Sequence, residues 1–321
     1  MSTENAEKEN HTVSFIIPAL NEEHHIRTTL SSIHRAAEDL TAYEIIVVDN
    51  GSTDGTDRVA REAGAEVLSL PGVPVAALRN EGACRARYKY LVFLDADVAL
   101  TREWRQRIIP VLAELNGSTY TIAGSTCGLG VGANSLQRCW WGRPRAERRP
   151  KYMNSGHMIV RRGDFLDLGG FDEALLTGED SEFCQRERNV PVRIFHDDRL
   201  RVIHDGYPAT VRQFFRRERW HALGDYSSLG IFLRSKPALA SVAQFVVLAT
   251  SLACTLLTSN ALWLLLYPLL VLPLCFFAAY SRAPGIHNCL LLNAFLYLVY
   301  FNARATALVD IAFQRAYTRK R

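Results

Sequence analysis

The chain has 321 residues, which is enough for one large domain or two smaller ones. Its net charge of +4 gives no reason to expect a nucleic-acid partner. The seven cysteines show no C-x-x-C pair and no zinc-ligand spacing, so we expect a reducing compartment and no disulfide framework. The polar first dozen residues lack an apolar core, which argues against a cleavable signal peptide.

The first half of the chain alternates between strand and helix patterns. Short apolar runs predict strands, and longer segments with apolar residues three and four apart predict helices. The predicted strands cover 13–20, 44–49, 66–70 and 90–95, and the predicted helices cover 22–37, about 54–63, and 75–87. This alternation predicts an α/β fold with a mostly parallel, Rossmann-like sheet and helices on both faces.

The pattern changes after this alternating half. Gly128 to Lys151 is rich in Gly, Arg and Trp and lacks periodicity, so we expect a long loop and consider it a candidate acceptor lid. Order is expected to return at 153–161, with a helix at 180–188, a strand at 192–195 and an amphipathic helix at 210–223. That last helix combines aromatic residues with four arginines, which suits either a membrane interface or packing on its own domain.

The C-terminal quarter is strongly apolar. Ala238 to Leu257 and Ala261 to Tyr280 are free of charge and match the ~20 residues that a bilayer requires. A third segment, Cys289 to Phe313, is interrupted by polar residues, so it is expected to span or to lie at the interface. The basic tail at 315–321 favours the cytosol. We therefore expect a disordered terminus (1–12), an α/β domain facing the cytosol (13–236) and a multi-pass region in the cytoplasmic membrane (237–321) that contacts membrane lipids.

Two apolar runs end abruptly in carboxylates. Asp49 ends VVD, and Asp95 and Asp97 flank Ala96 at the end of FLDAD. Ligands of open α/β sheets bind at the carboxyl ends of the strands, so these side chains should share one crevice. Carboxylate oxygens suit Mg²⁺ or Mn²⁺ with substrate phosphates completing the coordination. The alternative for the D-x-D segment is a turn or a helix cap.

Other polar residues are expected at the same edge of the sheet. A carboxylate at the end of a strand can accept hydrogen bonds from a base or a ribose, and Arg79 can pair with a phosphate. Ordinary helix packing is the alternative for Asn80. The candidate donor-binding residues are Pro18, Asn21, Glu22, Asp49, Asn50, Gly51, Arg79, Asn80, Asp95 and Ala96.

The ordered set IIPALNEE, VVDNGSTDGT, RNEGACRAR, FLDAD, GGFDE and GED resembles the inverting family 2 glycosyltransferases of the GT-A fold, over about Val13 to Trp220. The resemblance implies that Asp49 contacts the nucleotide base, that Asp95 contacts the nucleotide, and that Asp97 binds a divalent metal. It implies a nucleotide-sugar donor, most commonly a UDP-sugar, and a membrane-associated bacterial enzyme.

The resemblance also assigns Asp180 as the general base. An inverting transfer needs a hydroxyl deprotonated as it attacks, and a positioned carboxylate does this. An N-cap is the alternative for Asp180, and Glu179 is expected to orient the acceptor or the base. His204 is a candidate third metal ligand, with a surface or core histidine as the alternative. The candidate acceptor or diphosphate contacts are Asn154, Ser155, Gly156, His157, Arg216, Arg219 and Trp220.

The segment RRERW resembles the Q-x-x-R-W motif of processive synthases, but Arg216 stands in place of the Gln. This difference weakens the case for a processive polymerase. We expect transfer to a hydroxyl of a lipid-linked or growing glycan. The alternatives are a polyprenyl-phosphate glycosyltransferase, whose phosphate acceptor needs no base, and an inactive scaffold. A dinucleotide enzyme is disfavoured because Gly128, Gly130 and Gly132 lie outside a βαβ unit.

Overall fold

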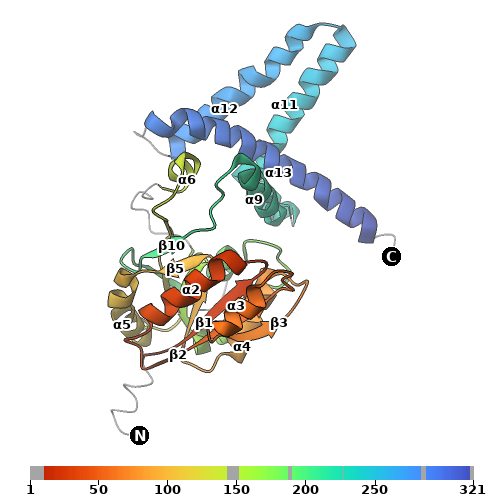
Figure 1. The fold of residues 1–321 in the computed structure, drawn as a ribbon. Helices are drawn as coiled ribbons and strands as arrows, with labels where there is room; N and C mark the ends of the chain where they lie inside the picture. Colours follow the sequence, from red (N-terminus) through yellow and green to blue (C-terminus); the bar gives the residue numbers. More distant parts are fainter. Residues whose placement is uncertain (1–10, 143–151, 187–189, 227, 283–286, 319–321) are drawn as a thin grey trace. The chain divides into compact units, whose positions relative to one another are not determined.

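The computed structural model describes residues 11–142, 152–186, 190–226, 228–282 and 287–318, with side chains to 309. The chain divides into two compact units (Figure 1). The first comprises the chain up to Val131 together with Arg145–Tyr207, and the second comprises Gly132–Pro144 and Pro208–Arg321. Part of the candidate lid, 143–151, lies outside the described residues.

The first unit is built on a seven-stranded sheet in the order β3-β2-β1-β4-β8-β6-β9. Adjacent pairs are parallel except those of β8, which is antiparallel to β4 and β6. The strands are β1 (Thr12–Ala19), β2 (Ala42–Asp49), β3 (Glu66–Ser69), β4 (Tyr90–Leu94), β6 (Thr121–Gly124), β8 (His157–Arg161) and β9 (Arg193–His196). The expectation of a mostly parallel sheet is confirmed.

Helices cover both faces of this sheet because alternate strand residues point to opposite faces. On one face Phe15 and Ile17 pack against α2 (Glu23–Ala36), α3 (Thr56–Glu62) and α5 (Arg102–Asn116). On the other face Ile16 and Phe93 pack against α4 (Val75–Arg85), α7 (Arg162–Asp167) and α8 (Glu179–Gln185). Strands β1 and β4 carry apolar side chains on both faces, which is typical of the buried centre of an α/β sheet.

A small second sheet has the order β5-β10-β7. It consists of β5 (Val98–Leu100), β7 (Gly128–Leu129) and β10 (Val202–His204). Because β5 follows the D-x-D segment directly, its pairing with β10 places His204 opposite Val98. The region expected as a loop from Gly128 therefore begins with a strand, and it also contains α6 (Ser135–Trp140), which starts at an Asn134–Gln137 capping box.

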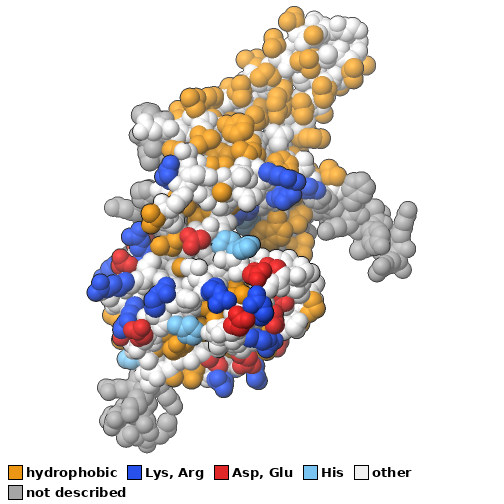
Figure 2. All heavy atoms as spheres, viewed as in Figure 1, with side chains coloured by type: hydrophobic (Ala, Val, Ile, Leu, Met, Phe, Trp, Pro, Cys, Tyr) orange, Lys and Arg blue, Asp and Glu red, His pale blue; other side chains and the backbone are white. Residues whose placement is uncertain are grey.

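The second unit consists of helices. They are α6, α9 (Val211–Asp225), α10 (Leu229–Arg234), α11 (Lys236–Thr258), the short η1 (Ala261–Leu265), α12 (Leu266–Arg282), the short η2 (His287–Cys289) and α13 (Leu290–Thr318). Among the described residues, three helical segments are long and apolar enough to cross a membrane, namely Lys236–Thr258, Ala261–Arg282 and Leu290–Val309. Apolar side chains cover the visible surface of α11 and α12 (Figure 2).

A disulfide joins Cys139 of α6 to Cys289, 150 residues later. The sequence analysis expected no disulfide framework, and this bond corrects that expectation. Short cysteine spacings could not reveal the pair, because its two members are far apart in sequence. Around the bond Trp140 packs against Phe214 and Tyr297, and Arg282 donates a hydrogen bond of 2.9 Å to the carbonyl of Trp140. These contacts attach α6 to α9, α12 and α13 within the second unit.

The close approach of α4 to the sheet depends on Gly82. A Cβ atom at this position would lie 2.5 Å from Cγ2 of Ile16. We expect Gly82→Ala to destabilise the protein by about 1 kcal/mol, because overpacking costs roughly 1–3 kcal/mol and the gain in helix propensity offsets just under 1. Gly163→Ala, on the exposed side of α7 with open space around it, is the matched control and should not lower the thermal unfolding midpoint.

Candidate active site

Asp49 holds a tight turn at the end of β2. It is buried, and its carboxylate accepts hydrogen bonds from the backbone N–H groups of Gly51 (3.0 Å) and Ser52 (2.9 Å) and from the Ser52 hydroxyl. Gly51 has φ +85°, which glycine adopts without strain. Asn50 joins this turn to a neighbouring loop through two hydrogen bonds with the backbone of Val73. Predicted donor residues thus form an ordered turn at the edge of the sheet.

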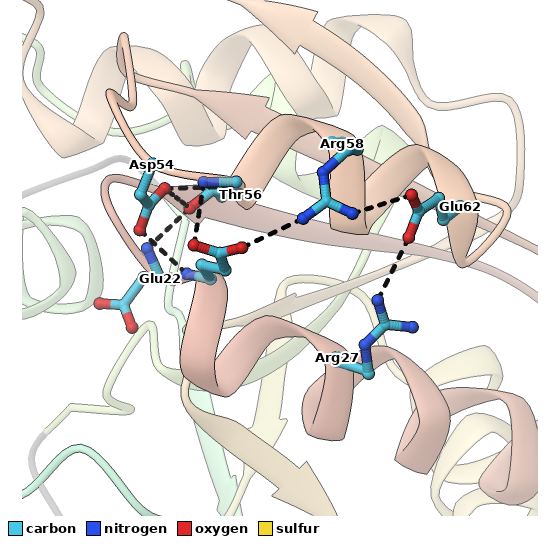
Figure 3. A network of polar contacts seen from close by, with 8 residues as sticks. Glu22, Arg27, Asp54, Thr56, Arg58 and Glu62 are labelled. Atoms are coloured by element: carbon cyan, nitrogen blue, oxygen red, sulfur yellow. Dashed lines mark hydrogen bonds and ion pairs between the residues drawn. The ribbon is translucent and has the colours of Figure 1, made fainter.

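A polar network fixes the start of α2 against the start of α3 (Figure 3). The Asn21 side chain accepts from Thr53 N–H at 2.8 Å, and Glu22 N–H donates to the Thr56 hydroxyl at 2.8 Å. Arg58 and Arg27 extend the network to Glu62. Only the backbone N–H of Glu22 takes part in the contact with Thr56, and the Glu22 carboxylate lies 2.9 Å from Nδ1 of His25. Burial raises the pKa of Glu22, and the charges of Asp97 and Asp95 also raise it.

Asp95, Asp97 and His204 form a group that can hold a metal ion, with one ligand atom from each within 4.8 Å of the others. Nδ1 of His204 is buried, lies 3.6 Å from the Asp97 carboxylate and has no hydrogen-bond partner among the described residues. The His204 ring stacks on Tyr207, with centroids 4.1 Å apart. Two carboxylates and one imidazole suit Mn²⁺ or Mg²⁺, so the residues present fit the expected cation.

Two glycines allow the backbone to approach these carboxylates. A Cβ atom at Gly206 would lie 1.8 Å from an Asp97 carboxylate oxygen, and one at Gly156 would lie 2.5 Å from an Asp95 carboxylate oxygen. Gly156 comes just before β8, whose antiparallel direction brings its first residues to the carboxyl end of β4. Gly206 was missed in the sequence analysis, although a glycine two residues after a candidate ligand was a usable signal.

Arg79 bridges the two acidic parts of the site. Its guanidinium is buried and donates to Asp95 at 2.6 Å and to Glu179 at 2.7 Å. The prediction that Arg79 pairs with a phosphate is not tested by these contacts and stays a prediction. What the structure adds is that the Arg79 side chain connects the D-x-D segment to the GED segment, although Arg79 and Glu179 are 100 residues apart in sequence.

Glu179 and Asp180 occupy the first turn of α8, and both are buried. Glu179 accepts from the Ser155 hydroxyl at 3.0 Å, and Asp180 accepts from Ser155 N–H at 3.3 Å. Burial raises the pKa of Asp180 to about 6, and repulsion from Glu179 contributes. A carboxylate with this pKa is suited to take a proton near neutral pH.

His157 lies in the core instead of on the expected acceptor side. Its Nε2 accepts a 2.9 Å hydrogen bond from the Trp104 indole. Its Nδ1 lies 3.2 Å from the Ser125 backbone N–H and 2.9 Å from the Ser125 hydroxyl, which donates to the Leu200 carbonyl. Burial lowers the pKa of His157 to about 3, consistent with a neutral ring. The side chain of His157 therefore supports the sheet edge from inside.

The remaining predicted residues have varied surroundings. Asn80 exchanges hydrogen bonds with the backbone of Phe171 at 2.9 Å, so its side chain holds the GGFDE loop. Exposed Asn154 accepts from Gly156 N–H. Pro18 lies within β1, and the Ala96 carbonyl accepts a hydrogen bond from the Thr29 hydroxyl.

Helix α9 of the second unit carries three further predicted residues, Arg216, Arg219 and Trp220. Their expected contacts with the acceptor or the diphosphate stay predictions.

Comparison with known proteins identifies this architecture. Residues 14–165 match the family model of glycosyl transferase family 2. Over 211 residues the chain is 26% identical to the pre-mycofactocin glycosyltransferase of Mycobacterium tuberculosis, covering 61% of this chain and 44% of that protein. It is 28% identical over 194 residues to glycosyltransferase AglE of Haloferax volcanii, covering 54% and 60%. The chain thus spans about half of these curated relatives.

Among solved structures, the mannosyltransferase PcManGT from Pyrobaculum calidifontis, in complex with GDP-Man and Mn²⁺, superposes with a TM-score of 0.57. The match covers 93% of this chain and 87% of that protein at 18% identity, so it shows a shared fold. Residues 14–165 therefore match a glycosyltransferase family 2 domain, and the chain shares the GT-A fold of the solved mannosyltransferase.

Proposed function

We propose that the chain is an inverting, metal-dependent glycosyltransferase that moves a sugar from a nucleotide-sugar to a hydroxyl of a lipid-linked or growing glycan at the membrane. The observation that carries this proposal is that the buried Arg79 side chain joins Asp95, of the group Asp95, Asp97 and His204, to Glu179. Glu179 is the neighbour of Asp180, the carboxylate that we propose as the base, and burial raises the pKa of Asp180 to about 6. A donor site and a base are thus parts of one connected structure.

The donor part of the proposal rests on the turn at Asp49 and the group at Asp97. The Asp49 carboxylate accepts two backbone hydrogen bonds within an ordered turn at the carboxyl end of β2, which supports its proposed role in contacting a base or ribose. Asp95, Asp97 and His204 would hold a divalent cation, which would supply positive charge next to the departing diphosphate. A UDP-sugar is the first donor to test, with GDP-sugars next, since PcManGT was solved with GDP-Man.

The buried acidic pair favours a hydroxyl acceptor. A phosphate acceptor is already ionised and needs no base, whereas a hydroxyl must lose its proton as it attacks. In this proposal Asp180 takes that proton, while Glu179 stays paired with Arg79 and the Ser155 hydroxyl. Attack from the face opposite the diphosphate inverts the anomeric centre without a covalent enzyme intermediate.

The three apolar helices support a membrane location for the acceptor. Nucleotide-sugars are made in the cytosol, so we propose that the catalytic domain faces the cytosol, in agreement with the basic residues at 315–321.

The donor and base roles can be separated by two variants. Asp97→Asn should abolish cation-dependent binding of the donor, measured by calorimetry with Mn²⁺ and UDP- or GDP-sugars. Asp180→Asn should bind the donor as the wild type does but lose transfer by 10²-fold or more, a size typical of general-base catalysis. Wild-type transfer by Asp180→Asn would refute the base assignment.

The rate of transfer should depend on pH through Asp180. The base must be deprotonated, and its pKa is raised to about 6, so the rate at saturating metal should fall about tenfold per pH unit below that value. Glu179→Gln removes the neighbouring negative charge and should move the midpoint to lower pH. Glu182→Gln, on the same helix but paired with Arg186, is the control and should leave the midpoint in place. Equal midpoints in all three proteins would contradict the proposal.

Arg79 should be essential for stability because it compensates buried carboxylates. Breaking a buried ion pair by removing one partner costs roughly 3–5 kcal/mol, so Arg79→Met should lower the unfolding free energy by about that amount. Arg85→Met removes an exposed pair with Glu66 from the same helix and should change little. Similar unfolding midpoints in detergent for the two variants would argue against this account.

A further inference from the structure

The helix α13 is apolar enough to span a bilayer over Leu290–Val309, but it packs against the polar helix α9. Contacts occur at three levels along the pair. Phe214 shares an apolar cluster with Leu296, Glu218 pairs with Arg304 at 3.4 Å, and Ala222 shares a cluster with Ala307. Helix α9 therefore accompanies α13 through the middle and second half of the candidate span.

Helix α9 is unsuited to the hydrocarbon region. It carries four arginines, and an arginine at the bilayer centre costs roughly 2.5–3.5 kcal/mol on insertion scales. Arg212, Arg216 and Trp220 are exposed, and their spacing of four residues puts them on the side of α9 opposite Phe214 and Glu218. Since α9 must stay in contact with water, the part of α13 beside it cannot lie at the bilayer centre.

The contacts of Arg304 explain how a charged side chain is accommodated within this apolar segment. Its guanidinium is buried, pairs with both Glu218 and Asp225 of α9, and lies 4.8 Å from the centroid of the Tyr300 ring. A cation in a spanning helix would need a partner within the bilayer or would extend toward the headgroups. Here the partners belong to the amphipathic helix, so Arg304 joins α13 to α9.

The opposite side of α13 is apolar and uncovered. Leu291, Phe295 and Val309 are 75%, 48% and 50% exposed. With 3.6 residues per turn these three lie within about 40° of one another, and roughly opposite the side that faces α9. Helices α11 and α12 also contact α13, but they leave this apolar side free. A helix with a free apolar side and a polar helix on the opposite side is typical of the membrane–water interface. Trp140, Tyr297 and Arg282, which pack together near its start, are also typical of that zone.

We propose that α13 lies in the plane of the membrane surface, with Leu291, Phe295 and Val309 on the lipid and α9 on its aqueous side. The chain then crosses the bilayer twice, through α11 and α12. The end of α13 returns to the same side as the glycosyltransferase domain. This inference deepens the proposed membrane location and does not depend on the chemistry proposed for the site.

Sidedness is tested in intact cells with a membrane-impermeant maleimide and peptide-level mass spectrometry on the full-length chain. We expect Ser259→Cys, in the turn between α11 and α12, to be labelled from outside. The exposed native Cys84 and a cysteine appended after Arg321 should be labelled only after permeabilisation. External labelling of the appended cysteine, with Cys84 protected, would show three crossings and overturn the inference. Protection of Ser259→Cys would show that the hairpin does not cross, which also overturns it.

External labelling of Cys84 would instead refute the cytosolic orientation given under the proposed function. The two failures are therefore distinguishable, because one concerns the end of α13 and the other concerns the enzyme domain.

Depth measurements distinguish an in-plane helix from one that enters the bilayer and returns. Fluorophores attached at Phe295→Cys and at Val309→Cys are separated by about 21 Å along the helix axis, at 1.5 Å per residue. Nitroxide lipids labelled near the headgroup should quench both sites equally and more strongly than lipids labelled near the chain end. Unequal depths, or stronger quenching of either site by the deep label, would contradict the in-plane arrangement.

Discussion

The ion pairs of the buried Arg79 guanidinium are the interactions on which the acidic site of the first unit depends. The carboxyl edge of the sheet gathers four carboxylates, of which Glu179 and Asp180 are buried and Asp95 and Asp97 are partly buried. Carboxylates held close together with little water repel one another. Arg79 enters from α4 and bonds to one member of each acidic segment. The same helix packs closely on β1 at Gly82, one turn after Arg79, so the helix that carries the guanidinium is held tightly against the sheet.

Much of this edge could be predicted from the sequence because the signals are local. An apolar run that ends in a carboxylate indicates both the strand and the position of its end, which is how Asp49, Asp95 and Asp97 were recognised. Strand order is not a local property. The antiparallel insertion of β8 between β4 and β6, which brings Gly156 and Ser155 to the site, depends on pairings that no single segment indicates.

Polar residues near a motif are where sequence reasoning was least able to separate roles. Asn80 and His157 have side chains and positions that are typical of substrate-binding residues. In the structure Asn80 holds a loop, and His157 accepts a hydrogen bond from Trp104, 53 residues earlier. Their roles depend on distant partners. The strand β7 and the helix α6 were missed for a different reason, since the Asn134–Gln137 capping signal was present but lay among glycines and arginines that favoured a loop.

The disulfide between Cys139 and Cys289 has a consequence for the order of biosynthesis. The second cysteine leaves the ribosome 150 residues after the first, so α6 cannot be covalently attached until the whole α11–α12 pair has been made. Until then the segment that becomes α6 has neither its bond nor the aromatic neighbours that α13 supplies. The second unit is therefore completed by its last helix, and a nascent chain that stalls after α12 retains an unpaired thiol at Cys139.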